Sequence, residues 1–249
     1  MSDHGTLMHR AALASLSVTV FLIALKFVAY IATDSVSMLA SLADSGLDFF
    51  ASMINLVAVR SSLTPPDREH RFGHGKAEPL AGLAQGAFIA GSATFLIIEA
   101  VSRLTQPHVI ERETVGFIVM GIAIAATIGL VGYQRMVVAK TASLAISSDQ
   151  SHYTSDLITN VGVVVSLVLS AQFGWKYADP LIAIAIALFL AWTSWGVFRA
   201  SSDQLMDHEL PDEDRAKITS LVMRPAHVRT LHDLRTRASG LNTFIQFHI

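Results

Sequence analysis

The sequence contains no cysteine and carries little charge. Without cysteine there are no disulfides and no thiolate metal sites, so Asp, Glu and His remain as the strong metal ligands. Only 15% of the residues are charged, whereas a soluble globular domain usually carries about 25%. The net charge of −2 shows no excess of basic residues, so no nucleic-acid partner is expected.

Long apolar runs account for the low charge, and 52% of the residues are hydrophobic. Runs of about 20 apolar residues span a lipid bilayer as helices. The first run is too long for a signal peptide, so we expect it to be retained. Lys26 lies inside it and is expected to extend its side chain to the far membrane interface. Six spans are predicted, at approximately Ala11–Ala32, Ser37–Arg60, Leu80–Leu104, Thr114–Met136, Thr141–Phe173 and Pro180–Arg199.

The distribution of Lys and Arg predicts the orientation. Cytoplasmic loops carry an excess of both residues. One side would hold Arg10, Arg60, Arg68, Arg71, Lys76, Arg135, Lys140 and Arg199, and the other only Arg103, Arg112 and Lys176. Eight basic residues against three place both termini in the cytoplasm.

Two of the apolar runs contain pairs of ligand-type side chains. Asp44 and Asp48 are four residues apart in the second run, and His152 and Asp156 are four apart in the fifth. Residues at this spacing lie on one face of a helix, one turn apart. An ionised Asp at bilayer depth costs several kcal/mol. These carboxylates are therefore expected either to be paired with another polar or charged group or to have a function.

The two pairs are predicted to lie at the same depth. Asp48 precedes Arg60 by twelve residues, and His152 follows Lys140 by twelve. If Arg60 and Lys140 mark one interface, both lie roughly 18 Å from it, at 1.5 Å rise per residue. The sequence therefore predicts one metal site formed by Asp44, Asp48, His152 and Asp156. The alternative is two separate polar pairs that hold helices together.

The loop after the second run contains Asp67, His70 and His74. Ligands of these types on a flexible loop suit a labile zinc ion. The alternative is a solvated basic loop that fixes the orientation of the protein, and the spacing does not choose between them.

The chain changes character after residue 206. Pro211 begins a short amphipathic helix to about Met223, and a hairpin is expected from Val228–Arg237 and Thr243–Ile249. A turn centred on Gly240 would place His232 opposite His248, as a metal-binding pair or an incidental one. About forty residues are too few for an independent core, so we expect either a partner or a chain that stops short of its natural end.

These features together resemble the cation diffusion facilitator family, and most closely its bacterial zinc and ferrous-iron efflux branch. The motifs that carry the resemblance are Ser-Leu-Ala-Asp44-Ser-Gly-Leu-Asp48, His152-Tyr-Thr-Ser-Asp156, Asp67-Arg-Glu-His70-Arg-Phe-Gly-His74-Gly-Lys76, and His232-Asp-Leu-Arg-Thr-Arg with Phe-Ile-Gln-Phe-His248. They extend over essentially the whole chain, and their combination is far more specific than one Asp-x-x-x-Asp.

The resemblance implies a homodimer in the inner membrane of a bacterium. It implies an all-α membrane domain of six helices (residues 1–206) and a cytoplasmic α+β domain of the ferredoxin-like αββαβ type (207–249), here apparently truncated because the last helix and strand are absent. It assigns Asp44, Asp48, His152 and Asp156 to the transport site. Asp67, His70 and His74 would form a second site, His232 and His248 part of a third, and Lys76 and Asp207 an interprotomer charge interlock.

The expected function is efflux of a divalent metal ion, Zn²⁺ above all, in exchange for protons. Three carboxylates and an imidazole suit Zn²⁺ and tolerate Fe²⁺, Cd²⁺ or Mn²⁺. Metal binding requires deprotonated ligands, so metal and protons compete for the site. The alternatives are a membrane metalloenzyme, which needs an open coordination position and a general base, and a metal sensor without transport. No His-Glu-x-x-His motif occurs, and we expect no enzymatic activity.

Overall fold

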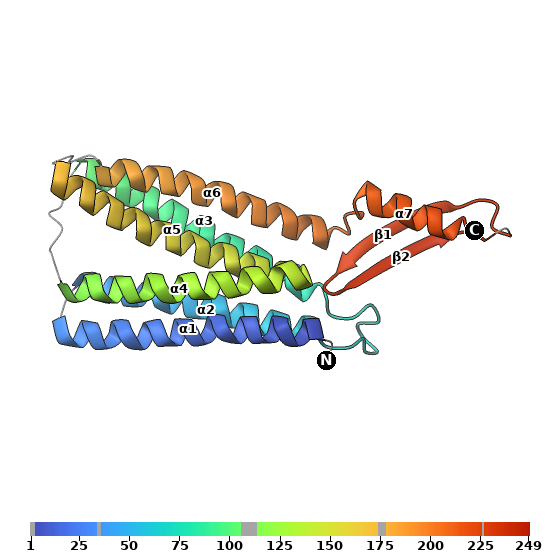
Figure 1. Ribbon diagram of the computed structural model, residues 1–249, viewed down its shortest axis with the longest axis horizontal. Helices are drawn as coiled ribbons and strands as arrows, with labels where there is room; N and C mark the ends of the chain where they lie inside the picture. The colour runs from blue at the N-terminus through green and yellow to red at the C-terminus, as the bar shows by residue number, and fades with distance from the viewer. Residues whose placement is uncertain (1–2, 34–35, 106–113, 174–177, 226) are drawn as a thin grey trace.

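Six long helices form a bundle, and a short helix and a two-stranded sheet follow at one end of it (Figure 1). The computed structural model describes residues 3–33, 36–105, 114–173, 178–225 and 227–249. The loops that contain Arg112 and Lys176 lie outside these residues. The elements are α1 (Asp3–Thr33), α2 (Val36–Ser62), α3 (Ala77–Thr105), α4 (Thr114–Thr141), α5 (Leu144–Phe173), α6 (Ala178–Leu205), α7 (Asp212–Val222), β1 (His232–Ser239) and β2 (Asn242–His248).

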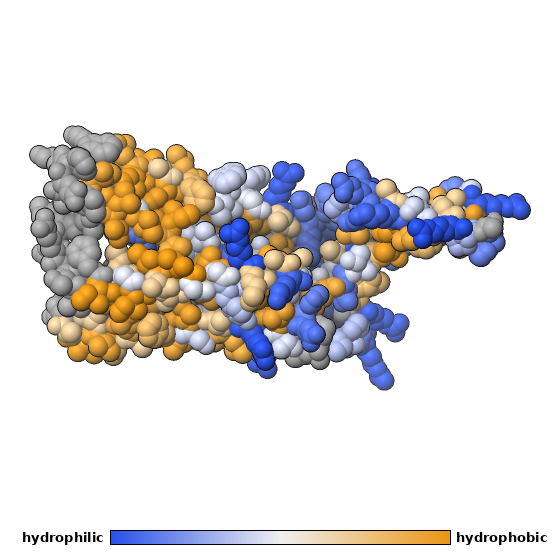
Figure 2. All heavy atoms as spheres, viewed as in Figure 1, coloured by the Kyte–Doolittle hydropathy of each residue, from blue (hydrophilic) through white to orange (hydrophobic). Residues whose placement is uncertain are grey.

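Five of the described helices are long and apolar enough to cross a membrane: α1, α2, α3, α4 and α6. Helix α5 is as long as the others, but its first half contains Ser, Asp, Gln, His and Thr side chains. Figure 2 shows apolar surface over the part of the bundle far from the sheet and charged side chains towards the sheet. These features define a helical membrane domain followed by a small polar unit.

Several helices extend beyond the predicted spans. Helix α1 begins at Asp3 rather than Ala11, and α6 continues to Leu205 rather than ending at Arg199. Hydropathy marks only the part of a helix that lies in lipid, whereas the backbone hydrogen bonds continue into water. The polar ends of these helices were therefore missed by the sequence prediction.

Small residues bring neighbouring helices into close contact. A Cβ atom on Gly82 of α3 would lie 2.2 Å from Ser201 Oγ of α6, and one on Gly162 of α5 would lie 2.2 Å from Ile186 Cδ1 of α6. The same pair α3 and α6 is linked by Ser194 Oγ, which donates to the Gly86 carbonyl at 2.9 Å. Packing of this kind replaces the hydrophobic effect, which does not act between helices in lipid.

Helices α4 and α5 are separated by only two residues. Ala142 has a φ of 50°, in the left-handed region, and thereby reverses the chain. The Glu78 side chain of α3 accepts hydrogen bonds from Ser143 Oγ at 2.6 Å and from the Ala145 N–H at 3.4 Å. It satisfies backbone donors that the start of α5 would otherwise leave unpaired, and it fixes the polar end of α5 against α3.

The hairpin of β1 and β2 is antiparallel and lies at the same end of the bundle as the N-terminus (Figure 1). Ser239 pairs with Asn242 across a turn at Gly240, whose φ is 58°. The turn lies against the start of α3, because a Cβ atom on Gly75 would lie 2.4 Å from the Ser239 carbonyl oxygen. Contacts at the turn therefore position the sheet.

No residue of α7 is buried. Large apolar side chains of this region remain exposed, among them Leu221 at 54% and Ile249 at 73%. The helix and hairpin alone thus form no closed core, as their length predicted.

Candidate metal site

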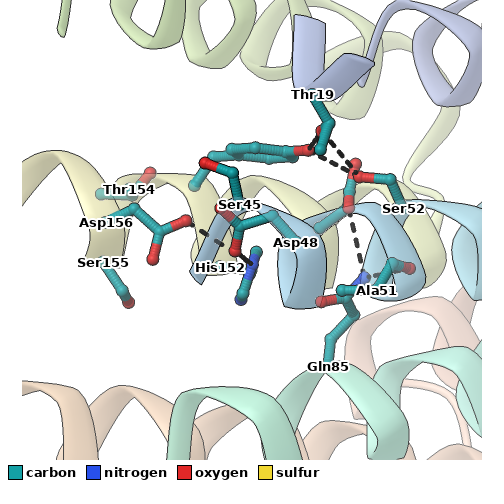
Figure 3. Close-up of polar contacts among 12 residues, drawn as sticks. Thr19, Ser45, Asp48, Ala51, Ser52, Gln85, His152, Thr154, Ser155 and Asp156 are labelled. Atoms are coloured by element: carbon teal, nitrogen blue, oxygen red, sulfur yellow. Dashed lines mark hydrogen bonds and ion pairs between the residues drawn. The ribbon is translucent and has the colours of Figure 1, made fainter. Parts of the chain in front are cut away.

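Asp48 of α2 and His152 and Asp156 of α5 form a compact cluster between the two helices (Figure 3). His152 Nε2 lies 3.1 Å from Asp48 Oδ1 and 3.5 Å from Asp156 Oδ2. His152 is only 4% exposed, and both carboxylates are partly buried. The equal depth predicted for Asp48 and His152 is observed.

The spacing of the three ligand atoms suits a tetrahedral zinc ion. Ligands about 2.0–2.2 Å from zinc stand roughly 3.3–3.6 Å apart at the corners of a tetrahedron. The two distances to His152 Nε2 are close to that range, and all three atoms lie within 4.8 Å of one another. Asp156 Oδ2 is buried and makes no hydrogen bond within the described part of the chain. The cluster therefore offers acceptor atoms that a cation would satisfy.

Asp44, the fourth predicted ligand, lies outside this cluster. It is exposed, one turn of α2 before Asp48, and the group of ligand atoms within 4.8 Å does not contain it. The structure brings three of the four predicted transport-site residues together.

Lys26 does not extend to the membrane interface, so that prediction was wrong. Its ammonium group donates to Ser45 Oγ at 2.6 Å and to the Ser41 carbonyl at 3.1 Å, both on α2. Intrahelical bonding leaves few polar groups for a lysine inside lipid, and the serines of the carboxylate-bearing face of α2 provide them.

Sequence reasoning missed Asp149, three residues before His152 on α5. The Asp149 carboxylate is fully buried and accepts hydrogen bonds from Ser15 Oγ of α1 at 2.6 Å, Gln134 Nε2 of α4 at 2.7 Å and Gln85 Nε2 of α3 at 3.2 Å. Gln85 Nε2 also donates to the Ala51 carbonyl of α2 at 3.1 Å. This network joins five helices. Its signal in the sequence was the isolated Gln in each of two apolar helices.

Tyr153 forms a second buried link beside His152. Its hydroxyl lies 2.5 Å from Thr19 Oγ1 of α1 and 2.6 Å from Ser52 Oγ of α2 (Figure 3). Asp48 and Ser52 are one turn apart on α2, and His152 and Tyr153 are adjacent on α5. The hydroxyl contacts therefore hold α2 against α5 at the height of the metal cluster.

The loop between α2 and α3 also gathers its three predicted ligands. Asp67 Oδ1 lies 3.5 Å from His70 Nδ1, and Asp67 Oδ2 lies 3.4 Å from His74 Nε2. The His70 and Glu69 backbone N–H groups donate to Asp67 Oδ1, at 2.6 and 2.9 Å. The hydrogen bond from His70 is the main reason that the pKa of the Asp67 carboxyl is lowered. Asp67 is therefore held ionised and in place.

His232 and His248 face each other across the hairpin, as predicted, but for a different reason. Pairing from Ser239 and Asn242 outward would leave the two histidines one residue out of register. A bulge between His232 and Arg235 restores the match, and Asp233 within it has a φ of 53°. The turn alone did not predict the pair correctly.

Lys76 and Asp207 form an ion pair at 2.5 Å within this single chain. Asp207 also accepts a hydrogen bond from Arg237 of β1 at 2.9 Å. The hydrogen bond from Lys76, followed by the one from Arg237, lowers the pKa of the Asp207 carboxyl. This cluster links the start of α3, the end of α6 and the sheet.

A helical membrane domain with a buried His-and-carboxylate cluster and a small polar domain defines a cation-handling membrane protein. Residues 12–206 match the cation efflux transmembrane domain, and residues 210–249 match the cytoplasmic domain of cation efflux proteins. The chain belongs to the cation efflux family.

Among its relatives is the cation-efflux pump FieF of Klebsiella pneumoniae, 44% identical over 247 residues, which cover 99% of this chain and 82% of the relative. FieF of Shewanella oneidensis is 44% identical over 239 residues (96% and 80%), and FieF of Serratia proteamaculans is 42% identical over 247 residues (99% and 82%). These matches confirm the family resemblance. They support a divalent-cation efflux transporter of the bacterial inner membrane, and the membrane domain implies a lipid bilayer around it.

Proposed function

We propose that this chain exports Zn²⁺ in exchange for protons by alternating access. The observation that carries the proposal is the cluster of Asp48, His152 and Asp156, with ligand atoms spaced for zinc between two helices of the membrane domain. Imidazole and carboxylate ligands without thiolate bind zinc in a form that a transporter is able to release, and they tolerate Fe²⁺, Cd²⁺ and Mn²⁺.

Asp44 is the fourth ligand of this site in our proposal. It lies one turn from Asp48 on the same face of α2, so a small rotation or shift of α2 would bring its carboxylate to the ion. A site with three ligands in one state and four in another would bind zinc with different affinities in the two states. Transport by alternating access needs such a difference.

The coupling of zinc transport to protons follows from the same ligand chemistry. Zinc binds neutral imidazole and ionised carboxylates, so protons and zinc exclude each other from the cluster. His152 is the ligand whose ordinary pKa lies nearest neutral pH. We assign to it the proton that enters as zinc leaves.

We propose six membrane spans, with α5 as the sixth. The polar first half of α5 faces the other helices through Asp149, His152 and Tyr153, so its low hydropathy reflects the site rather than exposure to water. The N-terminus and the sheet lie at one end of the bundle (Figure 1), which suits an even number of crossings. The excess of Lys and Arg at that end assigns both termini to the cytoplasm.

In this proposal residues 1–206 form the transport domain and residues 207–249 belong to a ferredoxin-like cytoplasmic domain. The chain acts as a homodimer, in keeping with its match to the cytoplasmic domain of the family, and Lys76 and Asp207 interlock between protomers in the assembled state. Asp67, His70 and His74 recruit zinc at the membrane surface. His232 and His248 contribute to a metal site of the cytoplasmic domain.

Zinc flux into proteoliposomes tests the proposal. Reconstituted protein should accumulate Zn²⁺ in vesicles that are more acidic inside than outside, because protons leave as zinc enters. Collapse of the proton gradient with a proton ionophore should stop this accumulation. The same vesicles tested with Fe²⁺, Cd²⁺ and Mn²⁺ would rank the ions. A zinc flux that does not depend on the proton gradient would exclude antiport. The absence of flux for every divalent ion tested would exclude the proposed transport.

A further inference from the structure

Lys26 is a cation inside the membrane domain, on the helix next to the carboxylate-bearing face of α2. Its ammonium group is held by Ser45 Oγ at 2.6 Å and by the Ser41 carbonyl at 3.1 Å. Ser45 is only 1% exposed. It follows Asp44 directly and lies one turn before Asp48 (Figure 3). An uncompensated charge in this position is costly, so its presence there calls for a partner or indicates a function.

Two hydrogen-bond acceptors without charge do not explain why a lysine is placed there. A hydroxyl and a carbonyl would serve a neutral donor equally well. The charge, however, lies beside the candidate site, because Ser45, which accepts the shorter hydrogen bond of the ammonium, is adjacent to Asp44 and one turn before Asp48 on α2. Lys26 is thus placed near the acidic groups that would receive a divalent ion.

The lysine also lies on a defined side of the cluster. Ser41 and Ser45 precede Asp48 on α2, so Lys26 contacts α2 between the cluster and the α1–α2 connection. The hairpin and the loop with Asp67 and His74 lie at the opposite end of the bundle (Figure 1). An ion that arrives from the hairpin end reaches Asp48 and His152 before it reaches the lysine. An ion that leaves by the other end passes the lysine.

We propose that Lys26 is a built-in counter-cation that weakens zinc binding and speeds release at the end of the bundle away from the hairpin. This inference rests on the proposed transport function. While zinc is bound, the ammonium stays on Ser45 and Ser41 and repels the ion. When zinc leaves, the ammonium neutralises part of the negative charge of Asp44 and Asp156. The empty site is thereby stabilised, and the transport cycle avoids a tightly bound state.

Removal of this charge gives effects of opposite sign on affinity and turnover. In Lys26→Met the cluster loses a repelling charge, so the Kd for zinc should fall by at least about tenfold, because the interaction with a unit charge a few ångströms away at the effective dielectric of a protein exceeds the free energy of a tenfold change. The KM should fall with it, and the maximal rate should fall too because release is slower. Lys26→Arg keeps the charge and should stay near wild type. A merely structural lysine would give weaker binding on removal.

Zinc titration calorimetry and proteoliposome flux on the same full-length proteins test this inference. All variants are made in a chain with His74→Ala and His232→Ala, so that the titration reports the α2–α5 cluster. Tighter binding with slower maximal flux in Lys26→Met, and wild-type behaviour in Lys26→Arg, would support the role. Unchanged or weaker binding in Lys26→Met, or the same change in Lys26→Arg, would overturn it.

A second variant keeps the test decisive if Lys26→Met does not fold. Ser45→Ala retains the lysine and removes its closest acceptor, so the ammonium moves towards the acidic groups and zinc binding should weaken. Unchanged or tighter binding in Ser45→Ala contradicts the inference. The parent chain is the control for the function itself. If it neither binds nor moves zinc, the proposed function fails, whereas a working parent with no effect of these variants refutes only the role of Lys26.

Discussion

Asp149 and Asp156 lie two turns apart on α5, on one face of the helix, and their surroundings differ in kind. Asp149 is fully buried, and neutral donors on three other helices contact its oxygens. Asp156 is partly exposed, faces His152 and Asp48, and has an oxygen with no hydrogen bond. His152 lies between the two.

The difference separates a structural carboxylate from a ligand. A buried acceptor surrounded by donors holds helices together, and most of its lone pairs are already used. Acceptors gathered around one point, with few donors among them, require a cation from outside. The balance of hydrogen-bond donors and acceptors around each carboxylate, rather than its burial or charge, therefore distinguishes the two roles.

The largest expected effect follows from removal of a ligand. Asp48→Ala or Asp156→Ala should abolish zinc flux, because each deletes one of the three clustered ligands, while the protein still elutes as a folded species. Ser155→Ala is the matched control, since within the described part of the chain its hydroxyl donates to the Ser151 carbonyl one turn earlier and to no other group. Wild-type flux in either Asp variant would show that the cluster does not carry the ion.

Asp149→Ala should instead act on stability. It removes the acceptor shared by Ser15, Gln85 and Gln134. The Ser15 hydroxyl keeps the Ala11 carbonyl as an acceptor, but each Gln loses the partner of one amide hydrogen, and each orphaned buried donor costs about 1–3 kcal/mol. The melting temperature in detergent should fall clearly, while the zinc affinity of the folded fraction stays within a few-fold of wild type. Ser151→Ala on the same helix, which loses one hydrogen bond to the Ser147 carbonyl, should barely change it. Loss of zinc binding without loss of stability would reverse the assignment.

His152→Asp should change the choice of ion. An all-carboxylate site is harder, so zinc should lose its advantage and Mn²⁺ should gain in relative rate. The pH profile of flux between pH 5.5 and 8 should move towards acid, because carboxylates ordinarily titrate near pH 4. His74→Asp in the loop is the control and should leave the preference unchanged. An unchanged ion preference together with an unchanged profile in His152→Asp would identify His152 as structural.

The smallest effect is expected at the loop. Asp67→Ala or His74→Ala should slow zinc flux without stopping it, because a surface site recruits ions but does not move them across the bundle. Arg68→Ala, on the same loop and without a ligand atom, controls for a change of charge and of loop structure. Complete loss of flux, with zinc still bound between α2 and α5, would place the loop in the translocation path.

Sequence patterns predicted the helices and the central cluster because both depend on local spacing. Hydropathy located the spans, and equal offsets of twelve residues from Arg60 and from Lys140 placed Asp48 at the height of His152. The role of Asp149 depends on Gln85 and Gln134, which lie 64 and 15 residues away, and no local pattern links them. Lys26 was misplaced for the same reason, since its acceptors are on another helix.

The hairpin shows a subtler limit. His232 and His248 were predicted to pair from the position of Gly240 alone, and they do pair, but through a bulge at Asp233 that the sequence did not reveal. The position of Asp44 outside the cluster depends on the rotation of α2 relative to α5. A periodic pattern shows which residues share one face of a helix. It does not fix how that face is turned towards the neighbouring helix, and that rotation decides whether a given ligand reaches the site.

Diffraction from zinc-loaded crystals at the zinc absorption edge tests the central claim most directly. The account predicts an anomalous peak between α2 and α5, about 2.0–2.2 Å from a carboxylate oxygen of Asp48, from His152 Nε2 and from a carboxylate oxygen of Asp156, and no peak beside Asp149. Zinc-saturated protein with peaks only at the loop or the hairpin, and none between α2 and α5, would contradict it.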